Sequence, residues 1–350
     1  MRKFEVVSFS ILVNKQSNAG LSLEQTAEWI KDFVNNCKDL RHLEIKLNIT
    51  LELCFLSHRS KIVHRIFKRL QNKLKGLHSL KLSLAGEDGP VFGVKTATLI
   101  FPQLSNLRKL TLSCGREQRP VMELICSNCT ELESLSFRSS RFHVESYPGL
   151  ANLSRLKSLE LISEAEIVSR CEYTSSLIKT IGKLSELESL HLLVTPFCVN
   201  LRPLSDLAHL KNLKFCIGTE KSLYFSRKCT LNQLRHLKIY PNSPQSEYTN
   251  IVLSDVHMEC IMDKVKFPKI KSLDLSNNGT ITGKSLKLIT THCSTLESLS
   301  IGGFFFFSIL ELKNAADELK NLQEIRVSDI CYFKNHIQQF QLKGLPARKM

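Results

Sequence analysis

The sequence predicts an α/β solenoid, in which short strands and helices alternate along the chain and stack on one another. One string, of the form L-x-x-L-x-L, occurs eleven times between residues 40 and 327. Successive strings start 23 to 37 residues apart, an interval that fits one strand, one helix and two turns. Several of the intervening segments carry apolar residues at helical spacing, as stacked helices require.

The strings predict the strands, because apolar residues at alternate places lie on one face of an extended chain. Such strands are too short to be stable alone, so neighbours must stack in parallel. We identify the pattern as a leucine-rich repeat and expect a single domain over residues 1–350, with about 11 to 12 irregular repeats. The expected shape is a right-handed horseshoe with concave strands and convex helices. The strings begin at Leu40, Leu77, Leu107, Leu132, Leu156, Leu187, Leu210, Leu234, Ile270, Leu296 and Leu322, with a weaker copy at Phe4.

Helices are predicted between the strings. Residues 22–37 carry one apolar stripe, and Ser22 with Gln25 forms a plausible capping box. Residues 60–74 carry a second stripe, and shorter helices are expected at 121–129, 285–293 and 309–319. In the strands, Leu135, Leu159 and Leu190 should be almost fully buried.

Three repeats share a cysteine, in the form C-x-x-L-x-x-L-x-L, at Cys37, Cys129 and Cys293. The unit at 270–301 resembles the cysteine-containing leucine-rich repeats of F-box proteins. Ile281 and Thr282 fill its I-T positions, and Leu286 and Ile289 fill its helix positions. Asn278 and Gly283 depart from the cysteine and the aspartate of that pattern.

This resemblance implies the substrate-recognition arm of an SCF-type (cullin-RING) ubiquitin ligase. In that family an F-box precedes the repeats and holds the cullin adaptor, and no F-box is visible in this sequence. A cullin adaptor is therefore expected as a partner only if an F-box lies outside this chain. One alternative is a stand-alone scaffold or inhibitor of the ribonuclease-inhibitor type. Another is a basic surface that binds nucleic acid or membrane.

Composition limits the function classes. The chain has 350 residues, 43% of them hydrophobic, which excludes a disordered protein or a small disulfide scaffold. Lys and Arg number 48 against 33 acids, and the net charge of +15 favours acidic partners. The start resembles no signal peptide, and the most apolar window, 301–310, is about half the length of a membrane span. We expect a cytoplasmic or nuclear protein whose 12 cysteines are free thiols.

No sequence motif indicates catalysis or metal binding. The sequence has no nucleotide-binding glycine loop, no H-E-x-x-H and no G-x-S-x-G. Cys126 and Cys129 form a lone C-x-x-C, whereas a zinc site needs four ligands. We expect these two to be buried thiols, and the chain to be a non-enzyme without cofactor or metal.

Three surfaces are candidates for partner binding. The strand face of the seventh and eighth strings should gather cations with an aromatic ring, which suits an acidic or phosphorylated protein partner. The helix at 60–74 should present a basic convex face, and a run of four phenylalanines could form a hydrophobic contact. Ordinary solvated or core positions remain the alternative reading at all three. The residues are, in that order, Lys214, His236, Lys238 and Tyr240; Lys61, Arg65, Lys68, Arg69 and Lys73; and Phe304, Phe305, Phe306 and Phe307.

Overall fold

A computed structural model describes most of the chain, in two compact units. The units are Met1–Ile167 and Val168–Met350, and each is described by itself. The described residues are 6–14, 28–33, 37, 40–50, 56–85, 92–116, 119–141, 147–163, 171–197, 201–217, 228–240, 253–276, 281–302, 308–328 and 339–341.

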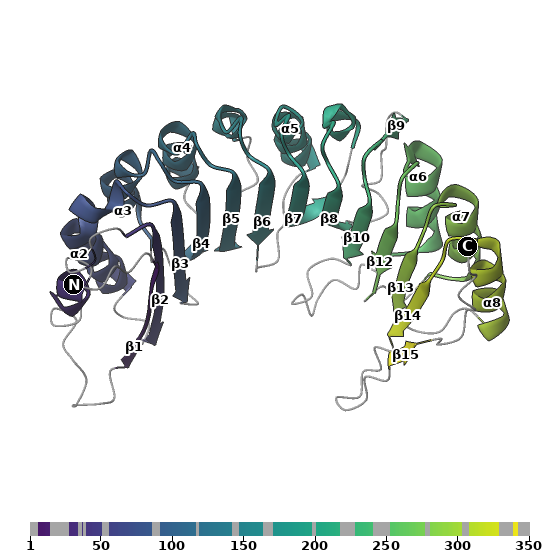
Figure 1. The fold of residues 1–350 in the computed structure, drawn as a ribbon, viewed down its shortest axis with the longest axis horizontal. Coiled ribbons are helices and arrows are strands. Elements are labelled where there is room, and N and C mark those ends of the chain that lie inside the picture. Colours follow the sequence, from purple (N-terminus) through teal and green to yellow (C-terminus); the bar gives the residue numbers. More distant parts are fainter. Residues whose placement is uncertain are drawn as a thin grey trace. The chain divides into compact units, whose positions relative to one another are not determined.

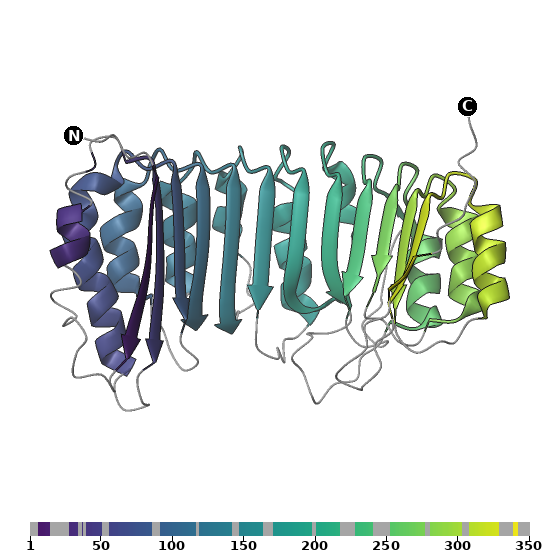
Figure 2. The same ribbon diagram turned by 60° about the horizontal axis from the view of Figure 1, so that its bottom comes forward.

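In the first unit, the described residues form six strands that lie in chain order, each parallel to its neighbours. Helices cover one side of this sheet and leave the other side to the strands (Figures 1 and 2). The strands are β1 (Val6–Asn14), β2 (His42–Thr50), β3 (Ser79–Ala85), β4 (Lys109–Arg116), β5 (Ser134–Arg141) and β6 (Ser158–Ser163). The helices are α2 (Leu56–Leu74), α3 (Val94–Ile100) and α4 (Arg119–Asn128), with 3-10 turns η2 (Phe101–Gln103) and η3 (Pro148–Asn152).

The second unit repeats this plan, with helices behind a parallel sheet (Figure 2). Its parallel strands are β7 (Ser189–Phe197), β8 (Asn212–Ile217), β10 (His236–Tyr240), β12 (Ser272–Leu275), β13 (Ser298–Gly302) and β14 (Glu324–Ser328). β15 (Gln339–Gln341) pairs with β14 in the antiparallel sense, and β9 (Cys229–Thr230) pairs with β11 (Val265–Lys266) in a small separate sheet. The helices are α5 (Cys171–Ile181), α6 (Asp255–Lys264), α7 (Gly283–His292) and α8 (Ile309–Glu318), with the turn η4 (Arg202–Asp206).

Each of the eleven predicted strands begins two residues after the first residue of its string, and backbone hydrogen bonds explain this start. The N–H groups of Glu133 and Ser134 both donate to the carbonyl of Arg108 in the preceding repeat, at 2.8 and 3.0 Å. The leucine before them lies in a tight turn, since Leu132 N–H donates to the Cys129 carbonyl at 3.2 Å. The same bonds recur from repeat to repeat, so one strand sets the register of the next.

The predicted core is confirmed. Leu135, Leu159 and Leu190 are 0%, 1% and 0% exposed. Leu135 lies in register between Leu110 and Leu159, so the leucines of adjacent strands stack into a continuous apolar column. The chain is therefore an α/β leucine-rich repeat solenoid, as the spacing of the strings predicts.

The helices agree in part with the sequence pattern. α4, α7 and α8 begin and end within two residues of their predicted bounds, and α2 begins earlier, at Leu56. Of the helix expected at 22–37, residues 28–33 are helical and most of the rest lies outside the described residues. α3, α5 and α6 were not predicted. α3 has seven residues, four of them the β-branched Val94, Thr96, Thr98 and Ile100, which form helices weakly. The burial of Thr96, Ala97 and Ile100 stabilises it.

Candidate functional site

A row of outward side chains crosses the strand face of the second unit. His191, Lys214, Lys238 and Asp274 occupy the fifth place of their strings on β7, β8, β10 and β12, and they are partners in the sheet register. Neighbouring strands lie about 4.8 Å apart, so these side chains are direct neighbours. The predicted residues Lys214 and Lys238 are therefore brought side by side.

Lys238 is held by its neighbours. Its Nζ lies 2.6 Å from Asp274 Oδ2 and 4.9 Å from the centre of the Tyr240 ring. Asp274 also accepts hydrogen bonds from Ser276 N–H at 2.9 Å and Ser276 Oγ at 2.5 Å. Burial alone would raise the pKa of Asp274, but the hydrogen bonds from Lys238 and Ser276 outweigh it and hold the pKa below its ordinary value. Lys238 is therefore paired with Asp274 and is not available to bind an anionic group of a partner.

Tyr240 stacks on a residue that the sequence analysis did not single out. The rings of His191 and Tyr240 lie 5.8 Å apart between centroids and 19° from parallel. The two come from strands that β8 separates, at different places of their strings. The signal that could have identified His191 is its fifth place in LESLHL, which it shares with Lys214 and Lys238.

Three exposed basic side chains gather beside this stack: Lys214, Arg235 and His236. His236 is in register with Asn212, two residues before Lys214 on the neighbouring strand. Arg235 directly precedes it, and its N–H donates to the Lys211 carbonyl at 2.8 Å. Among the described residues, no carboxylate forms an ion pair with any of the three. We call these three residues the cationic patch.

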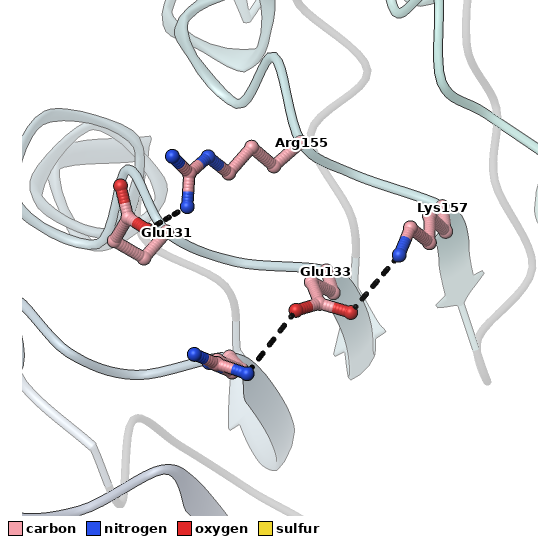
Figure 3. Close-up of polar contacts among 5 residues, drawn as sticks. Glu131, Glu133, Arg155 and Lys157 are labelled. Carbon is pink, nitrogen blue, oxygen red and sulfur yellow. Dashed lines mark hydrogen bonds and ion pairs between the residues drawn. The ribbon is translucent and has the colours of Figure 1, made fainter.

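The strand face of the first unit differs because most of its described charges are paired, with Lys109 as an exception. Glu44 and Lys81 lie 2.9 Å apart, and Arg138 lies 3.0 Å from Glu160. In the turns before the strands, Glu133 lies 3.3 Å from Lys157 and 3.8 Å from Arg108. Figure 3 shows the pair between Glu133 and Lys157 together with the pair between Glu131 and Arg155. Exposed pairs of this kind contribute about 0–1 kcal/mol each, but they leave little unbalanced charge.

Two residues of the predicted basic face of α2 have partners within the first unit. Arg69 lies 2.8 Å from Glu28, and Lys73 Nζ donates to the Cys37 carbonyl at 3.3 Å. Lys61, Arg65 and Lys68 are exposed. The expected hydrophobic contact at Phe304 to Phe307 lies outside the described residues.

The cysteines of the C-x-x-C are buried thiols in the structure. Burial raises the pKa of Cys126 to about 12, with further contributions from Cys129 and Glu123, and burial alone raises the pKa of Cys129 to about 12. Thiols with such pKa values are poor nucleophiles and poor metal ligands at neutral pH. In the part of the chain that the structure describes, no three His, Cys, Asp or Glu side chains form a group that could hold a metal ion. Within the same part, no helix is both long and apolar enough to cross a membrane.

The fold and its strand face define the class of molecule as an α/β leucine-rich repeat solenoid. No protein-family model and no curated protein matches the sequence.

Among solved structures, the chain is similar to one in the complex of TLR13 with ssRNA13, with 17% identity and a TM-score of 0.52 over 96% of this chain and 43% of that one. It is also similar to a chain of the Rad7 and Elc1 complex in yeast, with 19% identity and a TM-score of 0.45 over 87% and 83% of the two chains. A third similar structure is the LRR protein LIC12759 of Leptospira interrogans, with 15% identity and a TM-score of 0.33 over 84% and 80%. At these identities the similarity concerns the fold alone.

Proposed function

We propose that the chain acts by binding protein partners through the strand face of its second unit, and that it does not act as an enzyme. The observation that carries this proposal is the contrast in charge between the two units. On the described strand face of the first unit, Lys81 and Arg138 lie in ion pairs and Lys109 lies between serines without one. The cationic patch instead brings three basic residues together, none of them in an ion pair with a described residue. A rigid sheet holds the patch at fixed spacing, which lowers the entropic cost of binding.

The more specific part of the proposal is that the chain is the substrate-recognition arm of an SCF-type ubiquitin ligase. The repeat type supports it. Cys293 is buried at the C-terminal end of α7, and Thr282 caps the start of α7 by accepting a hydrogen bond from Lys284 N–H at 3.2 Å. These are the positions on which the resemblance to the F-box repeat proteins depends. A role as a stand-alone scaffold or inhibitor uses the same surface without the ligase.

The test separates these roles by what purifies with the chain. The tagged chain is expressed in cells, crosslinked and purified, and the bound proteins are identified by mass spectrometry. A ligase role predicts cullin and adaptor subunits, and partners whose ubiquitin conjugates decrease when the chain is depleted. Partners without cullin subunits, and with unchanged conjugates, would favour the scaffold.

Two variants with equal charge change locate the binding surface. Lys214→Glu with Arg235→Glu reverses two cations of the patch, and Lys61→Glu with Lys68→Glu reverses two on α2. Loss of the partners in the first variant alone agrees with the strand face. Loss in the second alone would contradict the proposal and favour the basic helix, with nucleic acid or anionic membrane as its partner. A steep dependence of binding on salt would identify nucleic acid.

A further inference from the structure

We infer that the cationic patch binds a phosphorylated side chain of the protein partner. This inference rests on the proposed protein-binding function and names the chemistry that the patch recognises. A serine, threonine or tyrosine phosphate fits the charge and the spacing of Lys214, Arg235 and His236 better than a carboxylate does.

The spacing follows from the sheet register. His236 is level with Asn212, and Lys214 is two residues further along β8. With a rise of about 3.3 Å per residue and about 4.8 Å between strands, the Cα atoms of Lys214 and His236 lie roughly 8 Å apart. Arg235 lies in the turn directly before β10, its side chain is exposed, and its N–H and that of His236 donate to the same Lys211 carbonyl. Its long side chain can therefore reach a group that Lys214 and His236 contact from the two strands.

The charge of the patch matches a phosphate. A phosphorylated side chain carries about −1.5 to −2 charges and three acceptor oxygens at neutral pH. An ammonium, a guanidinium and an imidazole provide several donors on different sides of such a group. A carboxylate carries one charge and two oxygens, so it would leave part of the patch unused.

The surroundings of the patch favour a peptide that carries one phosphate over a polyanion. Beyond β10, Asp274 and Glu324 carry negative charge on the same face, and Glu188 lies before β7 on the other side. These acids are paired with Lys238, Arg326 and Lys211, so the two cations next to the patch, Lys238 and Lys211, are already neutralised. A nucleic-acid backbone needs a longer run of available cations. The stacked rings of His191 and Tyr240 offer an apolar contact to the residues that flank the phosphate.

The experiment measures retention of the full chain on three immobilised peptide libraries. The libraries are degenerate except for the central residue, which is phosphoserine, serine or glutamate. We expect retention on phosphoserine to exceed that on serine and on glutamate by about tenfold, the factor that corresponds to 1.4 kcal/mol. Equal retention on glutamate and phosphoserine would overturn the inference.

Charge-reversal variants test whether the cationic patch, and not the basic helix α2, binds the phosphate. Lys214→Glu with Arg235→Glu should reduce retention on phosphoserine to the serine level, whereas Lys61→Glu with Lys68→Glu should leave it unchanged within about twofold. Because Lys214 and Arg235 are exposed, the first variant should keep the parental melting curve, and Lys214→Ala with Arg235→Ala provides a milder check. Equal losses in both reversed variants would mean that general charge attraction explains the binding, and would overturn the inference.

Two further arms complete the test. Lys238→Ala with Asp274→Ala removes one cation and one anion together and should preserve the preference for phosphate, because Lys238 is held by Asp274. Loss of that preference would overturn the assignment of the patch. Displacement of the phosphopeptides by an equimolar amount of single-stranded RNA would also overturn this assignment and would indicate that the patch binds nucleic acid. A chain that still captures its partners in cells, yet shows no preference for phosphoserine, would overturn this inference and leave the proposed protein binding intact.

Discussion

The leucine at the fourth place of each string is the residue on which the stacking of repeats depends. Leu135 is fully buried and lies between Leu110 and Leu159 of the adjacent strands. An aspartate at this position would bury a charge without a partner, so Leu135→Asp should reduce the free energy of unfolding by several kcal/mol. Urea denaturation measures the change. The matched control is Thr111→Asp on β4, which faces outward beside Lys81. An unchanged denaturation curve for Leu135→Asp would contradict the assigned register.

A second residue-scale prediction concerns Asp255, which joins two successive helices of the second unit. Its carboxylate accepts hydrogen bonds from Thr282 N–H at 2.9 Å, from Thr282 Oγ1 at 2.6 Å and from Ser285 Oγ. Burial would raise the pKa of Asp255, but the hydrogen bonds from Ser285 and Thr282 outweigh it and hold the pKa below its ordinary value of 3.8. The carboxylate therefore stabilises the fold above that value, and this stabilisation is lost as the pH falls through the lowered pKa.

Asp255→Asn should accordingly reduce the free energy of unfolding by about 1–2 kcal/mol at neutral pH. The difference from the parent chain should narrow below about pH 4. Urea denaturation as a function of pH measures both effects. Asp263→Asn, an exposed change in the same helix, is the control. A constant difference between the Asp255 variant and the parent chain across this range would show that the effect does not come from the charge.

Gly283, one of the two positions that depart from the F-box-type repeat pattern, lies against the next repeat. A side chain at Gly283 would collide with the carboxylate of Glu311. Glu311 caps α8 by accepting hydrogen bonds from Ser308 N–H at 2.5 Å and Ser308 Oγ at 2.9 Å, and these bonds lower its pKa. A larger residue at 283 would therefore displace this flexible carboxylate from its cap, a constraint that comes from the neighbouring repeat and is not visible within one repeat.

At the scale of elements, the strands could be predicted and several helices could not, for different physical reasons. Each strand could be predicted because the same string marks its start, and the same backbone hydrogen bonds to the preceding repeat recur at each of these starts. Helices such as α3 are short and depend on burial against neighbours, which the local sequence does not encode.

The candidate site could be predicted only in part, for the same reason. Lys214 and His236 were visible in their strings, but the pairing of Lys238 with Asp274 and the stacking of His191 on Tyr240 depend on strands far apart in sequence.

The cysteines buried where a helix meets the next strand lead to a prediction about thiol reactivity. Cys126, Cys129 and Cys293 are buried there, and burial raises the pKa of each to about 12. At pH 7 a thiol with this pKa is ionised in about one molecule in 10⁵. We therefore expect iodoacetamide to leave all three unmodified in the native chain and to modify them in urea, as measured by mass spectrometry. The native chain should contain no bridge between Cys126 and Cys129. Such a bridge, or about one equivalent of bound zinc, would contradict the prediction.

At the scale of the whole molecule, net charge and local pattern have different consequences. A charge of +15 attracts acidic molecules of any kind and raises their rate of encounter. It does not select among them, because most strand-face charges of the described residues are already paired. Selectivity must come from the places where pairing fails, and the cationic patch is such a place. Partner choice should therefore change with a few substitutions on β8 and β10, while the fold is unaffected.

The single domain predicted from the continuous repeat has a consequence for unfolding that can be measured. In a solenoid each repeat is stabilised mainly by its neighbours, so loss of structure in one repeat spreads along the stack. If residues 1–350 form one domain, the two compact units should unfold together. Cys126 and Cys129 report on Met1–Ile167, and Cys293 reports on Val168–Met350. Pulsed alkylation at increasing urea should expose all three at the same midpoint, and Leu135→Asp in the first unit should shift the midpoint of Cys293 as well. Separate midpoints, with Cys293 unaffected by Leu135→Asp, would show that the chain consists of two independent domains, with the cationic patch carried by the second.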